Sequence, residues 1–194
     1  HGLMEFVRES HARGMGVMLD YVMNHSAGQH PAFVNSRDSA TNAYRDWYVW
    51  QNPAPTGWSV FGSNPWRGTA DGAYYAPFWD QMPDFNLTNT AVVAWHHDNL
   101  RFWLNRGLDG FRLDAVPHMI ENNAVDWNDQ PESRVLTKRL QDKIKSYPGR
   151  YVVCEATAQP QAYGDDAVCG GAFAFGYVQH FVGAAQGQAE SVQA

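Results

Sequence analysis

The chain has 194 residues, enough for a domain with a substantial hydrophobic core, and its composition is that of a globular protein. Its net charge is −6 without a basic cluster, which argues against nucleic acid as a partner. No apolar run approaches the length of a membrane span, so we expect no membrane-inserted segment.

Four apolar runs predict buried strands, at residues 16–22, 108–116, 151–156 and 171–177. Helical patterns lie between or beside these runs. They cover residues 3–13, residues 90–106 behind an Asn89 cap, and residues 133–146, where apolar side chains recur every four positions. Strands that alternate with helices predict βα units and a parallel sheet, hence an α/β fold.

The segment at residues 23–88 interrupts this alternation. It is rich in proline, glycine, asparagine and aromatic residues, and a structureless loop of that length inside a domain is uncommon. We therefore predict a small inserted subdomain here, with most of its aromatic side chains forming its own core.

Cys154 and Cys169 form neither a disulfide framework nor a metal-binding motif by their spacing. Cys154 lies in an apolar run beside Glu155, so we expect a small buried apolar side chain there.

The strand around residues 110–118 (GFRLDAVPH) is the most informative part of the sequence. Phe111 and Leu113 point to one side of a strand while Arg112 and Asp114 point to the other. A buried arginine and aspartate are costly unless paired, and an arginine that holds an aspartate ionised makes it a candidate nucleophile.

Further polar side chains follow the predicted strands, namely Asp20, the pair Asn24-His25, His118 and Glu155. In a βα barrel all strand carboxyl ends open onto one face, where two carboxylates from neighbouring strands can share a cleft. Such a pair is what glycoside hydrolysis requires. From the residues alone, structural ion pairing explains Asp114 and Glu155 as well as catalysis does. Likewise, His25 and His118 can be read as hydrogen-bonded histidines of the core.

Four short motifs carry a family resemblance: DYVMNH at residues 20–25, MPDFN at residues 82–86, the strand at residues 110–118, and VVCEA at residues 152–156. In this order and spacing the chain resembles the catalytic barrel of the α-amylase family of retaining glycosidases, glycoside hydrolase family 13. The resemblance implies a partial (β/α)8 TIM barrel, about strands 3 to 6, with an inserted domain B after strand 3. The implied parts are barrel at residues 1–25, domain B at residues 26–88, and barrel again at residues 89–194.

The resemblance also implies roles for individual residues. Asp114 matches the nucleophile and Glu155 the general acid and base. Arg112 matches the residue that orients the nucleophile, and His25 and His118 match contacts to the cleaved sugar. Asp20 is implied as structural support for the loop that follows strand 3.

The resemblance also implies a calcium site in this chain. Asn24 and Asp84 match positions that bind calcium in many members, with a backbone carbonyl near His118, and oxygen ligands suit that ion. A hydrogen-bonded junction without metal explains the same two side chains. No organic cofactor is expected.

Part of the family pattern is missing. The third family carboxylate, an aspartate after a histidine at the end of strand 7, has no match after Glu155. The ends at His1 and Ala194 do not resemble natural termini, so we expect an internal fragment of a longer enzyme. A partial barrel leaves strand edges unpaired, so we expect this fragment to be inactive and poorly soluble on its own. The localisation stays open between cytoplasmic and secreted.

The expected activity is retaining hydrolysis of α-glucosidic bonds in starch-like or malto-oligosaccharide substrates. Residues 44–50 (YRDWYVW) resemble α-glucosidases and trehalose synthases as well as some amylases. A trehalose synthase-like transglycosylase or isomerase is therefore one alternative, and a non-catalytic amylase-like scaffold is another. These motifs do not distinguish hydrolysis from transglycosylation, nor do they fix linkage or chain-length preference.

Overall fold

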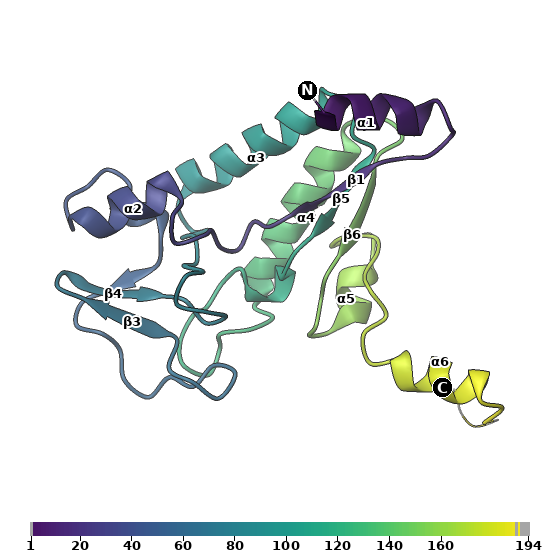
Figure 1. The fold of residues 1–194 in the computed structure, drawn as a ribbon. Coiled ribbons are helices and arrows are strands. Elements are labelled where there is room, and N and C mark those ends of the chain that lie inside the picture. The colour runs from purple at the N-terminus through teal and green to yellow at the C-terminus, as the bar shows by residue number, and fades with distance from the viewer. Residues whose placement is uncertain (1, 189, 191–194) are drawn as a thin grey trace.

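The computed structural model describes residues 2–188 and 190, and a parallel sheet lies at its centre (Figure 1). The strands β1 (Met18–Tyr21), β5 (Gly110–Leu113) and β6 (Tyr151–Cys154) are arranged in the order β1-β5-β6. Both strand pairs are parallel, with Asp20 opposite Arg112 and Leu113 opposite Cys154. The fold is α/β, as the alternation of strands and helices predicts.

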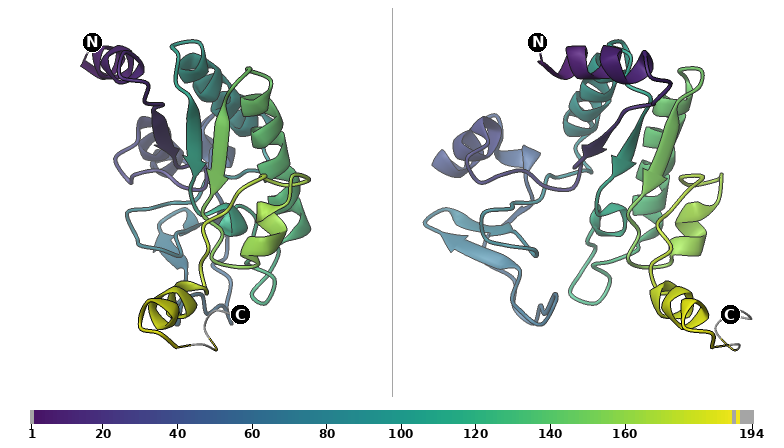
Figure 2. Two further views of the ribbon diagram at one scale, coloured as in Figure 1. Left: turned by 90° about the vertical axis from the view of Figure 1, so that its right-hand side faces the viewer. Right: turned by 45° about the vertical axis from the view of Figure 1, so that its right-hand side comes forward.

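The helices outside the inserted segment are α1 (Gly2–His11), α3 (Thr90–Leu104), α4 (Pro131–Lys145), α5 (Pro160–Gly164) and α6 (Val178–Ala185), of which α6 projects away from the sheet (Figure 1). Both views of Figure 2 show α3 and α4 side by side against one face of the sheet. Asn89 caps α3 as predicted, because its side-chain oxygen accepts a hydrogen bond from the Ala91 amide at 2.9 Å. No helix in the described residues is long and apolar enough to cross a membrane.

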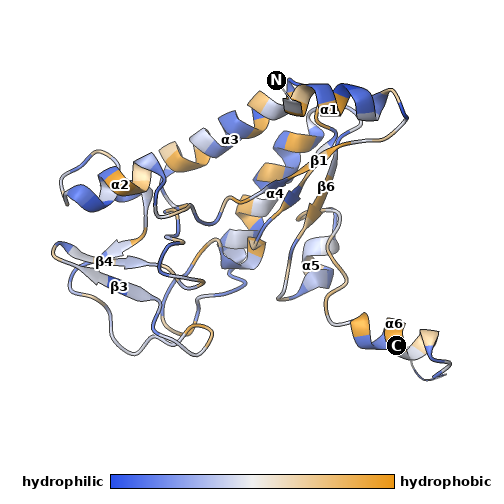
Figure 3. Cartoon of the chain, viewed as in Figure 1, coloured by the Kyte–Doolittle hydropathy of each residue, from blue (hydrophilic) through white to orange (hydrophobic). Residues whose placement is uncertain are grey.

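The core lies between the sheet and these two helices. Figure 3 shows apolar residues on β6 and along α3 and α4, in contrast to the polar outer positions of the helices. The fully buried core side chains include Leu100, Leu104, Phe111, Leu140, Ile144 and Val152. Gly110 lets β5 approach β6, since a Cβ there would lie 2.0 Å from the carbonyl oxygen of Tyr151.

The segment between β1 and α3 has secondary structure of its own. It contains α2 (Pro31–Asp38), the 3₁₀ turn η1 (Arg45–Trp47), and an antiparallel sheet in the order β2-β4-β3. These strands are β2 (Trp50–Gln51), β3 (Trp66–Thr69) and β4 (Gly72–Tyr75). Phe33 packs edge-on against Tyr48 and Tyr74, each with ring centroids 5.0 Å apart. Aromatic side chains thus form the core of this segment, as predicted.

Two expectations from the sequence are wrong. Residues 171–177 do not form a strand, because only Ala172 bridges to β6, at Cys154, and Gly170 and Gly176 have positive φ angles that interrupt extended backbone. Cys154 and Cys169 are joined in a disulfide rather than being separate buried thiols. The chain returns past the end of β6 and brings the second cysteine to the first.

Candidate active site

The polar side chains of the site share one face of the parallel sheet near its carboxyl end. Phe111 and Leu113 are buried, whereas Arg112 and Asp114 on the opposite face retain some exposure. Asp114 donates its amide to the carbonyl of Tyr21, and the Glu155 amide bonds the carbonyl of Leu113. This pairing continues the parallel register and places Asp114 and Glu155 side by side, directly after the neighbouring strands β5 and β6.

Arg112 connects the acidic groups of this face. Its Nη1 donates to Asp20 at 2.7 Å and 3.0 Å and also contacts Oδ1 of Asp114, while Nη2 lies 2.9 Å from Oε2 of Glu155. A guanidinium has donors in a fixed planar fork, so one arginine can orient several carboxylates at once. The predicted support by Arg112 therefore extends from Asp114 to Glu155 and to Asp20.

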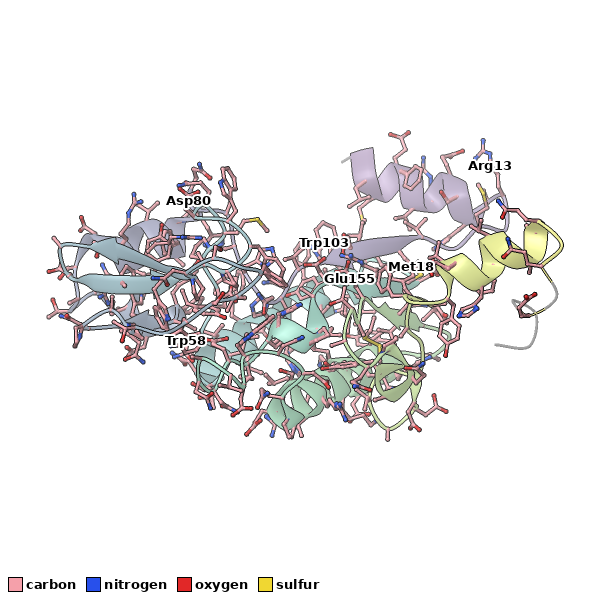
Figure 4. The ribbon with its side chains drawn as sticks, turned by 90° about the horizontal axis from the view of Figure 1, so that it is seen from below. Arg13, Met18, Trp58, Asp80, Trp103 and Glu155 are labelled. Carbon is pink, nitrogen blue, oxygen red and sulfur yellow. A yellow bond between two sulfur atoms is a disulfide. The ribbon has the colours of Figure 1, made fainter. Side chains whose placement is uncertain are left out.

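Glu155 has a second anchor in a backbone turn. Ala115 has a left-handed φ of 50°, unusual for a residue other than glycine, and its amide donates to Oε2 of Glu155 at 3.2 Å. Ala115 directly precedes the 3₁₀ turn η2 (Val116–His118), which carries His118. Figure 4 labels Glu155 near the middle of the view, between the small antiparallel sheet and α6. The turn at residues 115–118 therefore both donates a hydrogen bond to Glu155 and carries His118.

His25 and His118 both pack against the same aromatic ring. Phe78 has its ring centroid 5.3 Å from that of His25 and 5.2 Å from that of His118. Burial lowers the pKa of each histidine to about 4, although the nearby charge of Glu155 partly opposes this at His118. Both imidazoles are therefore neutral near pH 7 and can donate or accept hydrogen bonds.

Other aromatic rings surround His118. Trp127 stacks on it with an interplanar angle of 11°, and Phe61 meets both rings edge-on at 5.3 to 5.4 Å. Phe61 is 56% exposed and has a left-handed φ of 50°. These rings add an apolar wall next to the carboxylates.

The predicted pair Asn24 and Asp84 meets where β1 leads into the antiparallel segment. The Phe85 amide donates to the carbonyl of Asn24 at 2.9 Å, and the Asn24 amide group donates to Oδ2 of Asp84 at 2.9 Å. Asp84 is buried, and its Oδ1 has no hydrogen-bond partner among the described residues. A buried carboxylate oxygen without a donor is an arrangement that suits a cation.

Glu121 is a further acidic group at this junction. Burial, and then the charge of Glu121, raise the pKa of Asp84 well above its ordinary value, and burial raises the pKa of Glu121 to about 8. Within the described residues, no three His, Cys, Asp or Glu side chains gather into a metal-binding group. A cation here would need the oxygens of Asn24 and of the backbone in addition to the two carboxylates.

All eight predicted site residues thus fall into two neighbouring clusters. Asp20, Arg112, Asp114 and Glu155 form an ion-pair network, with His25 and His118 beside it, and Asn24 and Asp84 form the junction. Sequence reasoning missed the Ala115 amide, Glu121 and the aromatic wall. The segment 119–130 offered no motif, and a left-handed alanine has no sequence signature.

Carboxylates held by an arginine at the carboxyl ends of adjacent parallel strands are typical of α/β enzymes that act at that face of the sheet. A family model described as "Alpha amylase, catalytic domain" matches residues 1–193. The chain belongs to this α-amylase catalytic-domain family.

Individual relatives include several activities. The chain is 37% identical over 133 residues to "Alpha-amylase 3" of Dictyoglomus thermophilum, covering 66% of this chain and 26% of that protein. It is 37% identical over 174 residues to "Trehalose synthase/amylase TreS" of Mycolicibacterium smegmatis, covering 84% of this chain and 29% of that protein. The chain therefore spans less than a third of the length of these relatives.

Solved structures agree on the fold. The alpha-glucosyl transfer enzyme XgtA superposes with a TM-score of 0.81 at 26% identity, covering 96% of this chain and 44% of that one. The alpha-amylase from H. orenii gives a TM-score of 0.81 at 26% identity, covering 95% of this chain and 38% of that one.

Proposed function

We propose that this chain forms part of the active site of a retaining glycosidase that cleaves α-glucosidic bonds in starch-like or malto-oligosaccharide substrates. The observation that carries this proposal is Arg112, which contacts both Asp114 and Glu155 at the ends of β5 and β6. Two carboxyl groups on one face, fixed by a shared cation, are the groups that glycoside hydrolysis with retention uses.

In the proposed mechanism an oxygen of Asp114 attacks the anomeric carbon while Glu155 donates its proton to the departing glycosidic oxygen. A covalent glycosyl ester forms on Asp114 and the leaving sugar departs as an alcohol. Glu155, now ionised, takes a proton from water, whose oxygen attacks the anomeric carbon and releases Asp114. In this proposal the neutral His25 and His118 hydrogen-bond hydroxyl groups of the cleaved sugar.

We further assign β1, β5 and β6 to strands 3, 4 and 5 of a (β/α)8 barrel, with residues 26–88 as domain B. Residues 1–25 and 89–194 are then barrel parts. The superposition on amylase-family structures over more than nine-tenths of the chain supports this assignment.

Calcium is proposed at the junction of these parts. Asn24, Asp84 and Glu121 would hold the ion, and the unpartnered Oδ1 of Asp84 supports this donor set. The ion would neutralise the carboxylates of Asp84 and Glu121 and join the residues after β1 to the segment at residues 83–85. Its role is structural, because no step of the mechanism above passes through it.

A trehalose synthase-like reaction is the second candidate, favoured by the match to the Mycolicibacterium trehalose synthase/amylase over 84% of this chain. In that reaction a sugar hydroxyl rather than water attacks the glycosyl ester. The complete polypeptide should be incubated with malto-oligosaccharides, maltose and trehalose and its products identified. Shorter oligosaccharides or glucose indicate hydrolysis, and interconversion of maltose and trehalose indicates the second candidate.

Asp114→Asn tests both candidates, since both need the covalent ester. We expect turnover to fall by at least a thousandfold while the protein remains folded. Retained turnover in a folded Asp114→Asn protein would sink the assignment of the nucleophile.

A further inference from the structure

The disulfide between Cys154 and Cys169 lies directly beside the proposed acid and base. Cys154 is the last residue of β6, and Glu155 is the next residue in the chain. Both cysteines are fully buried, and their Cα atoms are 6.4 Å apart. The cross-link therefore attaches the strand end that carries Glu155 to a segment fifteen residues further along.

Backbone hydrogen bonds surround the first cysteine. The Cys154 amide donates to the carbonyl of Gly171 at 2.9 Å, and the Phe173 amide donates to the carbonyl of Cys154 at 3.1 Å. These bonds are made by a segment that does not form a strand, so little regular structure holds it against β6. The disulfide adds a covalent connection between β6 and this returning segment.

The second cysteine is also fixed. The carbonyl of Asp165 accepts hydrogen bonds from the amides of Val168, Cys169 and Gly170, which closes a compact turn. Gln141 of α4 then donates to the carbonyl of Asp166 at 3.2 Å, which attaches the turn to the core helix. Cys169 is consequently a rigid point to which the end of β6 is fastened.

We propose that the disulfide is a positioning element for Glu155. The side chain of Glu155 must meet Arg112 and the Ala115 amide on one side and a glycosidic oxygen on the other, and small displacements of a catalytic group are costly. Loss of the cross-link leaves the end of β6, at the residue before Glu155, held only by backbone hydrogen bonds to β5 and to the returning segment. The consequence falls on proton donation more than on attack by Asp114, because Asp114 follows β5, which does not carry the cross-link.

This inference rests on the proposed function, and leaving-group dependence separates the two. α-Glucosyl fluoride needs little protonation of its leaving group, whereas maltotriose expels a sugar alcohol that must be protonated. The measured quantity is the ratio of kcat/KM for glucosyl fluoride to kcat/KM for maltotriose in the complete polypeptide. Glu155→Gln is the reference and should raise this ratio at least a hundredfold.

Cys169→Ser and the volume-filling double variant Cys154→Ala/Cys169→Val both remove the cross-link. We expect each to raise the ratio tenfold to a hundredfold, on the order of the loss for a displaced catalytic group. Ile144→Val, which trims the buried core under α4, is the matched control, and its ratio should equal that of the wild type.

Each outcome is decisive. If Glu155→Gln leaves the ratio unchanged, the proposed role of Glu155 fails. If Glu155→Gln raises the ratio but the cross-link variants lower both rates equally, or lower neither, the positioning role is overturned. If neither cross-link variant can be obtained folded, the disulfide serves folding rather than positioning, which also overturns the proposal.

Discussion

Nη2 of Arg112 lies 2.9 Å from Oε2 of Glu155, although the two residues come from different strands. The same guanidinium contacts Asp114 through its other terminal nitrogen. The proposed nucleophile and the proposed acid and base are therefore fixed relative to one another by a single side chain. Asp20 of β1, opposite Arg112 in the register, accepts hydrogen bonds from the same guanidinium.

Arg112→Lys should reduce kcat by about a hundredfold or more with a smaller effect on KM. A lysine keeps the positive charge but cannot reach three carboxylates with a planar fork of donors. Steady-state kinetics of the complete polypeptide on its best malto-oligosaccharide measure the effect. Arg150→Lys, an arginine of similar exposure before β6, is the control. A kcat within threefold of the wild type for Arg112→Lys would contradict the account.

Gly110→Ala should destabilise the protein by about 3 kcal/mol or more, because the new Cβ would overlap the backbone carbonyl of Tyr151 in the neighbouring strand. Gly68→Ala, also in a strand, adds a Cβ with no atom within 4 Å and is the control. Urea unfolding of both variants gives the comparison. Equal stability of the two variants would show that β5 and β6 are not packed as closely as described.

The sequence predicted the features that depend on local pattern. The alternation around Arg112, the Asn89 cap and the four-residue spacing of Leu136, Leu140 and Ile144 each reflect strand or helix geometry, and each is found in the structure. The pairing of Asn24 with Asp84 came from the family resemblance rather than from pattern.

Features set by the path of the chain could not be predicted. The spacing of Cys154 and Cys169 does not show that residues 165–170 fold back on β6. The apolar residues at 171–177 resemble a strand, but flanking glycines with positive φ angles permit only one bridge. Glu121 carries no signal in the sequence, since the burial that raises its pKa depends on how distant parts of the chain pack together.

His96 should make the protein less stable in acid. It is buried, its Nδ1 is hydrogen-bonded to the hydroxyl of Tyr21, and its Nε2 has no hydrogen-bond partner among the described residues. Burial, followed by the charges of His97 and His30, lowers the pKa of His96 to about 3 from the ordinary value of 6.5. The unfolded chain therefore binds a proton that the folded chain does not, and stability falls as the pH decreases from about 6.5 toward 3.

His96→Gln removes this proton uptake. The stability difference between wild type and variant should shift by about 3 kcal/mol in favour of the variant between pH 7 and pH 4, which is the linkage for a shift of this size. Urea titrations at several pH values measure it, with His180→Gln in α6 as the control. A difference that does not change with pH would contradict the burial of His96.

Calcium should stabilise the protein more at pH 8 than at pH 5. The pKa of Glu121 is raised to about 8, so without metal its favourable protonated state is lost as the pH rises from about 4.5 through 8. Calcium binds the ionised carboxylates, and its effect grows over the same range. Thermal unfolding with and without millimolar calcium, with magnesium as the control ion, measures the difference.

Glu121→Gln tests the same site from the protein side. The variant should be more stable than the wild type at pH 8 without calcium and should lose most of the calcium response. A calcium response that is unaffected by Glu121→Gln, or that is equal at both pH values, would place the ion elsewhere.

Trapping the covalent ester on Asp114 tests the proposed mechanism. The complete polypeptide is treated with 5-fluoro-α-glucosyl fluoride, whose ester hydrolyses slowly, then digested and analysed by mass spectrometry. We expect one added fluoroglucosyl group on the peptide containing Asp114 and no label on Asp114→Asn. Label on another residue, or turnover without any covalent label, would contradict it.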